Sequence, residues 1–341
     1  MKKILIFLLA FLSIFVGGCG KVNVDKYDFH TASQRQYLDG EYAQIGKYAA
    51  GEKELSRPNP IKLDISGDGK EHNVVLKEKG TTNELTYKTN SKVLEVYNLK
   101  ANTTYEWFID DASQGEFTTG KGIRNLYIDG ITNVRDIGGV ACNGGIVKQG
   151  LLIRCAKLTN DDNGEQLISI EGIEAFKKLG IKTELDLRQV EADSDDNIEQ
   201  GGITTSVIPG VNYISFPMAS GGNYLQLNRK VLKDLFAILA NEDNYPIIFH
   251  CSIGTDRTGV VAFLVNALLG VSKEDLYRDY LFSNFGDING VRTSSTIDDY
   301  IKKVTIDEAK SLSENVKEYL INQGVSEEDI NKVINIMTEK K

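Results

Sequence analysis

The stretch that decides the fold is His250-Cys251-Ser252-Ile253-Gly254-Thr255-Asp256-Arg257-Thr258-Gly259, in a chain of 341 residues. It lies between a short apolar run, 245–249, and a strongly apolar run, 257–269, which predict a buried strand and a helix. A loop at such a junction turns successive backbone N–H groups into one concavity at a helix N-terminus. That arrangement predicts an anion-binding site.

Two side chains in this loop suit the chemistry of phosphoryl groups. The field at a helix N-terminus lowers the pKa of a cysteine, so we expect Cys251 to be a thiolate at neutral pH and to act as a nucleophile. Arg257 follows six residues later, and its planar guanidinium can hold two phosphoryl oxygens. We expect phosphate to bind the backbone N–H groups of Ser252, Ile253, Gly254 and Thr255.

The sequence around this loop alternates between strand and helix patterns. Helical patterns at 172–179 and 227–239 lie on either side of a buried strand pattern at 181–187. Such alternation favours an α/β domain with a mostly parallel sheet flanked by helices, which we place at residues 121–341. The tail is predicted to be helical, with N-caps at Ser272, Thr305 and Ser326.

Residues 56–120 have a different pattern, which predicts a small all-β sandwich. Short runs of strand-forming residues are separated by Gly, Asn and Asp, at 61–65, 74–76, 85–87, 93–97 and 104–109. The stretch Leu-Lys-Ala-Asn-Thr-Thr-Tyr-Glu-Trp at 99–107 resembles the tyrosine-corner segment of fibronectin type III domains, which assigns the corner to Tyr105. A spacer, a substrate-positioning module and an adhesion module all remain open as its role.

The N-terminus has the layout of an export signal. Lys2 and Lys3 precede an apolar run at 4–16, which is shorter than the ~20 residues of a transmembrane helix. Val16-Gly17-Gly18-Cys19 resembles a bacterial lipobox, which implies cleavage before Cys19 and lipid attachment to its thiol; a plain signal peptide is the alternative. We expect a signal peptide at 1–18, a tether at 19–55, and a protein lipid-anchored to the extracytoplasmic face of the cell membrane.

Charge and composition exclude some classes of partner. The chain has 39 basic and 48 acidic residues, and loss of Lys2 and Lys3 would change its net charge from −9 to −11. Such an acidic protein is a poor general binder of nucleic acid. We expect no metal and no other cofactor, because no group of ligand residues has metal spacing and no dinucleotide-type glycine pattern follows a strand. His30 and His72 are predicted to be surface residues.

Cys142 and Cys155 flank a turn-like Asn-Gly-Gly stretch at 143–145. Outside the cytoplasm these two thiols could form a disulfide. Two separate buried thiols are the alternative, and the sequence leaves both open.

The loop at 250–259 resembles the Cys-x5-Arg-Thr signature of the protein tyrosine phosphatase superfamily. Its Asp-Arg-Thr-Gly ending is similar to the bacterial tyrosine/serine phosphatases. Other segments resemble that group in the same order, with Cys155 in place of a serine: Asn-Val-Arg-Asp-Ile-Gly-Gly at 133–139, Leu-Ile-Arg-Cys-Ala-Lys-Leu at 152–158, Leu-Asp-Leu-Arg at 185–188, and 270–281. The resemblance spans about residues 125–285. It implies hydrolysis of phosphotyrosine or another phosphomonoester, on a protein or a small molecule, through a cysteinyl-phosphate.

The resemblance also implies roles for neighbouring residues. His250 would fix the loop and favour the thiolate, and Thr258 would ease the departure of sulfur when water attacks the intermediate. The leaving group needs a proton donor, but the candidate loop at 216–223 contains no acid. The group's pattern suggests Asp256, with Asp193, Asp195 and Asp196 as the remote alternatives. We interpret Asn133, Arg135, Asp136, Arg154, Asp186 and Arg188 as scaffold.

Three hypotheses follow from these observations. The leading one is a phosphotyrosine or broad phosphomonoester phosphatase. The second is an inositol-phosphate or phosphoinositide phosphatase, although Thr255 stands where several relatives carry lysine, which leaves one positive charge fewer for a polyanionic substrate. The third is a non-catalytic surface binding protein, suggested by the β-rich segment.

Overall fold

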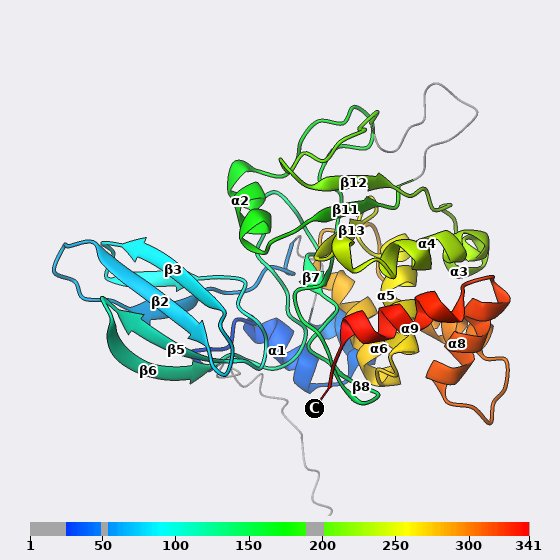
Figure 1. Cartoon of the computed structure of the whole chain (residues 1–341), viewed down its shortest axis with the longest axis horizontal. Helices are drawn as coiled ribbons and strands as arrows, with labels where there is room; N and C mark the ends of the chain where they lie inside the picture. Colours follow the sequence, from blue (N-terminus) through cyan, green and yellow to red (C-terminus); the bar gives the residue numbers. More distant parts are fainter. Residues whose placement is uncertain (1–24, 49–53, 189–200, 341) are drawn as a thin grey trace, which may run out of the picture.

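The computed structural model describes residues 25–48, 54–188 and 201–340. Figure 1 shows an all-β part on the left and a larger part with a central sheet and helices on the right. Cys19, Asp193, Asp195 and Asp196 lie outside the described residues. Across the described ranges, every helix is too short or too polar to cross a membrane.

The larger part is built on a five-stranded sheet. Its strand order is β12 (Asn212–Ser215), β11 (Thr183–Asp186), β13 (Ile247–His250), β10 (Leu152–Cys155) and β7 (Arg135–Asp136). All neighbours run parallel except β7, which is antiparallel to β10. Ile247 and Phe249 belong to one buried core and Ile248 to the other, so β13 is covered on both faces. This explains why 245–249 reads as a continuous apolar run.

Helices cover both faces of this sheet, in agreement with the predicted α/β architecture. One face belongs to the larger buried core, in which α5 (Asp256–Leu268) contacts β10 and β13, and to which five further helices contribute: α4 (Leu232–Leu239), α6 (Lys273–Phe282), α7 (Ser295–Val304), α8 (Leu312–Asn322) and α9 (Glu327–Met337). The other face packs against α2 (Ile170–Lys178). Every residue of α5 is buried, so this helix forms the centre of the larger core.

The predicted helix at 227–239 is broken in the structure. Tyr224–Leu227 forms α3, Arg229–Val231 forms the 3₁₀ turn η2, and α4 begins at Leu232. The side chain of Asn228, at the break, accepts from the backbone N–H of Ala219 at 2.6 Å and donates to its carbonyl at 3.0 Å. These bonds fasten the 216–223 loop to the break, a tertiary contact that helical periodicity does not reveal.

The predicted N-caps at Ser272 and Ser326 are confirmed, and the one at Thr305 is wrong. Thr305 ends α7, and its hydroxyl donates to the carbonyl of Ile301 at 2.7 Å. The following helix begins later, where Ser311 and Glu314 form a capping box. Short 3₁₀ turns occur at η3 (Glu242–Asn244) and η4 (Ser283–Phe285).

A small sheet joins the C-terminal end of the described chain to the hairpin before β10. Its strands are β8 (Ala141–Cys142), β9 (Gly145–Val147) and β14 (Thr338–Lys340). Cys142 and Cys155 are separate free thiols, so they do not form the disulfide that the sequence left open.

The all-β part consists of two antiparallel sheets. One pairs β1 (Ile61–Asp64) with β4 (Val93–Val96). The other has the order β3 (Glu84–Thr89), β2 (His72–Glu78), β5 (Thr104–Ile109) and β6 (Ala112–Thr118). The predicted strands are present, and β6 was missed because most of its side chains are polar and exposed. The hydroxyl of Tyr105 accepts from the backbone N–H of Lys100 at 3.1 Å, as a tyrosine corner requires.

Part of the segment predicted to be a tether is folded. Within 25–48, α1 (Ala32–Asp39) opens with a capping box from Thr31 to Gln34, and the 3₁₀ turn η1 (Tyr42–Lys47) follows. Tyr37 is fully buried in the larger core, and its hydroxyl donates to the carbonyl of Arg278 at 2.9 Å. An aromatic residue in this polar segment therefore anchors α1 to the larger part of the protein.

The predicted exposure of His30 and His72 is wrong. His30 is fully buried, where Nδ1 meets Asp28 at 2.6 Å and Nε2 meets the carbonyl of Ile123 at 2.7 Å. His72 is also buried, between Asp68 and Asp110. Each histidine has one acidic partner close in the sequence and a second partner that is distant, Ile123 for His30 and Asp110 for His72.

Candidate active site

The signature loop lies between β13 and α5, as predicted. Cys251 follows the last residue of β13, and α5 begins at Asp256. Gly254 has a φ of +67°, and a Cβ atom there would lie 2.3 Å from the carbonyl oxygen of Cys155. Only glycine suits both the left-handed backbone and the close approach to the end of β10.

Side chains behind the loop hold its carbonyl groups. Nδ2 of Asn133 donates to the carbonyls of Ile253 at 3.0 Å and Gly254 at 3.1 Å. Nη2 of Arg154 donates to the carbonyls of Gly254 at 2.9 Å and Thr255 at 3.2 Å. With the carbonyls held in this direction, the N–H groups of residues 252–255 meet no hydrogen-bond acceptor within the described chain. Such a run of N–H groups without acceptors has the chemistry of an anion-binding nest.

A buried ion-pair network positions Arg154. Asp279, on α6, accepts from Arg154 and also from Nε of Arg135 at 2.8 Å. Both arginine side chains are fully buried, so each needs its carboxylate partner to offset the cost of desolvation. These two residues and Asn133 therefore serve as the scaffold that the sequence predicted.

The pKa of the Cys251 thiol is lowered in spite of its burial. Only 2% of the residue is exposed, and this burial acts to raise the pKa of the thiol. The charge on Arg257, and hydrogen bonds from the side chain and backbone of Thr258, outweigh burial and lower that pKa. The hydroxyl of Thr258 is buried and has no other hydrogen-bond partner within the described residues. Arg257 is 5% exposed, and its Nη2 donates to Ser252 Oγ at 3.3 Å.

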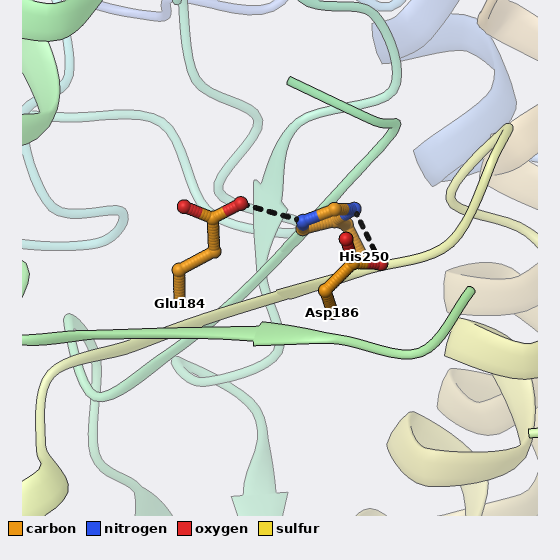
Figure 2. A group of neighbouring side chains, drawn as sticks. All are labelled: Glu184, Asp186 and His250. Atoms are coloured by element: carbon orange, nitrogen blue, oxygen red, sulfur yellow. Dashed lines mark hydrogen bonds and ion pairs between the residues drawn. The ribbon is translucent and has the colours of Figure 1, made fainter. Parts of the chain in front are cut away.

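His250 lies in a buried carboxylate pair behind the loop, as Figure 2 shows. Its Nε2 is 3.0 Å from Glu184 Oε1, and its Nδ1 is 3.7 Å from Asp186 Oδ1. Burial acts to lower the pKa of His250, but Asp186 and Glu184 outweigh it and raise the pKa. When it is protonated, His250 adds positive charge directly before Cys251 in the chain, which is the role that the resemblance implies.

Glu184, Asp186 and His250 are close enough to suggest a metal site, which their sequence spacing did not predict. Their oxygens already have partners. Asp186 accepts from the guanidinium of Arg188 and from the hydroxyl of Tyr213 at 2.9 Å, while Glu184 accepts from Ser206. A guanidinium bound to the same carboxylate repels a metal cation. The two carboxylates therefore suit a positively charged His250 better than a metal ion.

Asp256 is the first residue of α5, directly after the loop, and the structure reveals a partner for it that the sequence did not suggest. Its carboxylate accepts from Nε of Arg292 at 2.9 Å, from Nη2 of Arg292 at 2.8 Å, and from the hydroxyl of Tyr280 at 3.2 Å. Arg292 lies in a polar, glycine-containing segment between η4 and α7, outside every motif of the sequence.

The side chains of Asp136 and Thr255 both bond to scaffold groups of the protein. Asp136 bonds the side chain of Arg124 and the backbone N–H groups of Gly138 and Gly150, so it braces the turns around β7. Thr255 is fully buried, and its hydroxyl accepts from Nδ2 of Asn133 at 3.2 Å. Thr255 therefore adds a scaffold contact, where a lysine would add positive charge.

Known protein sequences resemble this chain. A sequence model described as the tyrosine phosphatase family matches residues 126–339. A putative tyrosine-protein phosphatase of Cupriavidus necator is 28% identical over 183 residues, which cover 48% of this chain and 64% of the relative. A tyrosine-protein phosphatase of Nostoc commune is 28% identical over 125 residues, covering 32% of this chain and 42% of the relative. The match thus spans less than two thirds of each relative, but the family match spans more than half of this chain, which belongs to the tyrosine phosphatase family.

Proposed function

We propose that this protein is a cysteine-dependent phosphatase that hydrolyses phosphotyrosine or other phosphomonoesters through a cysteinyl-phosphate. The observation that carries the proposal is the lowered pKa of Cys251, which directly precedes a run of N–H groups without an acceptor among the described residues and is influenced by the charge of Arg257. This combination places a nucleophile and the positive charge for a phosphoryl group in one site.

In the first half-reaction the Cys251 sulfur attacks phosphorus, and the bond from phosphorus to the leaving oxygen breaks. Arg257 and the N–H groups of 252–255 stabilise the equatorial oxygens of the phosphoryl group. Asp256 directly precedes Arg257 at the start of α5, and this position keeps its carboxyl group close enough to the phosphoryl group to exchange a proton there. In the second half-reaction water releases phosphate, and Thr258 stabilises the returning thiolate.

The structure favours simple phosphomonoesters over polyanionic substrates such as inositol phosphates. Thr255 is buried against Asn133 and supplies no charge to the site. The cation of Arg292 is paired with Asp256, so it adds no net positive charge for extra phosphates. A protein phosphotyrosine or a small aryl phosphate fits this charge distribution better.

The test is phosphate release by the full chain, wild type and Cys251→Ser, with reductant and without metal. The substrates are an aryl phosphate, a phosphotyrosine peptide and inositol hexakisphosphate. We expect the wild type to hydrolyse the first two and the variant to lose that activity. A reduced wild type with no activity on all three substrates would reject the enzyme and favour a binding protein.

We also propose that the chain is a lipoprotein, tethered through Cys19 on the extracytoplasmic side of the membrane, and that 56–120 is a fibronectin type III-like module. The lipobox-like sequence at 16–19 supports the first statement, and the Tyr105 hydrogen bond supports the second. Metabolic labelling with an alkyne fatty acid tests the anchor. Label that persists in Cys19→Ser would contradict it.

A further inference from the structure

Arg292 makes a two-point contact with Asp256 that has the geometry of a guanidinium–carboxylate pair. Nε lies 2.9 Å from Oδ1 and Nη2 lies 2.8 Å from Oδ2. The hydroxyl of Tyr280 donates to Oδ1 as a third partner at 3.2 Å. Because every one of these contacts donates to the carboxyl group, they fit the ionised carboxylate, which only accepts hydrogen bonds.

Arg292 is itself held in place. Its backbone N–H donates to Asn284 Oδ1 at 2.8 Å, and its carbonyl accepts from Asn284 Nδ2 at 3.1 Å. Its Nη1 donates to the carbonyl of Asn289 at 2.7 Å, and only 19% of its side chain is exposed. The hydrogen bond to Asp256 is the largest influence on the pKa of Arg292, which is raised. Arg292 is therefore held in place on both its backbone and its side chain.

The pair is close to the reacting atoms. Asp256 is the first residue of α5, directly after the loop that carries Cys251, and its charge acts to raise the pKa of both Cys251 and Tyr224. The titratable and charged groups that surround Asp256 come from its own helix, the loop, α3, α6, α7 and the Arg292 segment: Arg257, Cys251, Tyr224, Tyr280, Tyr300 and Arg292.

We propose that Arg292 is a positioning residue for the second half-reaction, in which it holds Asp256 as the carboxylate that accepts a proton from the attacking water. This inference rests on the proposed function. Water oxygen bonds to phosphorus, the phosphorus–sulfur bond breaks, and its electron pair returns to Cys251 as thiolate. The proton of the water passes to Asp256, and inorganic phosphate leaves.

This arrangement narrows the substrate class. Donating a proton to a leaving oxygen requires the protonated form of Asp256, which loses the ion pair with Arg292. Aryl phosphates need that proton least, because a phenolate leaves more readily than an alkoxide. The pair therefore favours phosphotyrosine and other aryl phosphates over phosphoserine.

The experiment is a comparison of kcat and kcat/KM for 4-nitrophenyl phosphate in the full chain and Arg292→Met. For this substrate, kcat/KM reports formation of the cysteinyl-phosphate, whereas kcat includes its hydrolysis. We expect kcat to fall roughly 10- to 100-fold, as for a displaced general base, while kcat/KM stays within about twofold. Phosphoenzyme, measured by intact mass after acid quench, should accumulate in the variant.

Further variants show whether Arg292 positions Asp256 or only stabilises the fold. Asp256→Asn should show the same split, and the double variant should be no worse than Asp256→Asn alone. Arg292→Lys, which keeps the charge without the two-point contact, should lie between wild type and Arg292→Met. Arg278→Met, which removes an arginine paired with Glu274 on α6, is the matched control and should leave kcat unchanged.

Equal falls in kcat and kcat/KM without accumulated phosphoenzyme would overturn the role of Arg292, as would additive effects in the double variant. If Arg292→Met does not fold, the split in Arg292→Lys decides. Failure of the proposed function would look different, because the wild type would then release no phosphate or Cys251→Ser would remain active.

Discussion

The ends of β10 and β13 carry two buried cysteines with opposite chemistry. Cys155 ends β10 and faces His250 across the parallel pair, and Cys251 is the next residue after His250. Burial raises the pKa of Cys155 well above its usual range, and Glu184 adds to the effect. Burial also acts to raise the pKa of Cys251, but there Arg257 and Thr258 lower it. Burial alone makes an inert thiol, whereas the start of a helix with a cation makes a nucleophile.

The largest expected effect comes from breaking the contact between the two strand ends. Gly254→Ala places a Cβ atom 2.3 Å from the Cys155 carbonyl oxygen and should displace the loop. We expect kcat/KM to fall about 100-fold or more, because small displacements of reacting groups are costly. Steady-state kinetics with an aryl phosphate measures it. Gly180→Ala is the matched control, since Gly180 has a similar φ of +73° with open space around it, and it should keep full activity.

A second test removes the ring of His250, which directly precedes Cys251 and is paired with Glu184 and Asp186. His250→Gln should lower the free energy of unfolding by about 2 kcal/mol at pH 6, because Glu184 and Asp186 lose a charged partner. The pKa of His250 is raised in the folded state, so its contribution is complete below the unfolded pKa of ~6.5 and declines as pH rises through the folded pKa.

Urea unfolding between pH 6 and pH 9 measures this decline. The reference protein and the His250→Gln variant should both carry Cys251→Ser, because the lowered pKa of Cys251 makes its thiol titrate in the opposite sense over the same range. A stability difference between these two proteins that does not change with pH would contradict an imidazolium at this position.

The pKa contrast itself predicts selective alkylation. Iodoacetamide at pH 6.5 should modify Cys251 in the native protein, while Cys155 and Cys142, whose pKa values are raised by burial, should react only after unfolding. Arg257→Met should slow modification of Cys251 by about tenfold, since a neighbouring cation favours the thiolate. Peptide mass spectrometry locates the adducts. Equal labelling of Cys155 and Cys251 would remove the contrast.

The smallest effect is expected at the inert thiol. Cys155→Ser should change kcat/KM by less than about twofold and lower stability by about 1 kcal/mol, because a hydroxyl replaces a thiol in an apolar core. Kinetics and the urea midpoint measure the two effects. A large loss of activity with an unchanged midpoint would mean that the Cys155 thiol takes part in the reaction.

Sequence motifs and hydrophobic periodicity predicted the local elements of the structure. The strand–loop–helix unit around Cys251 and the strands at 61–64 and 104–109 were predictable, because each is a local pattern in a few consecutive residues. The break at Asn228 was not predictable, nor were the docked helix α1 and the burial of His30. The docking of α1 and the burial of His30 depend on partners distant in the sequence, and the break at Asn228 depends on hydrogen bonds to the loop that precedes α3.

The sequence by itself determined the reactive loop, since Cys251, Gly254 and Arg257 must be close once a strand, a tight turn and a helix follow one another. Only the tertiary structure decided what surrounds it. Glu184 reaches His250, Asp279 joins Arg135 to Arg154, and Arg292 reaches Asp256 across 36 residues. Ion pairs of this kind form between residues that the fold brings close together. The local sequence around a charged residue does not indicate which distant charge will be its partner.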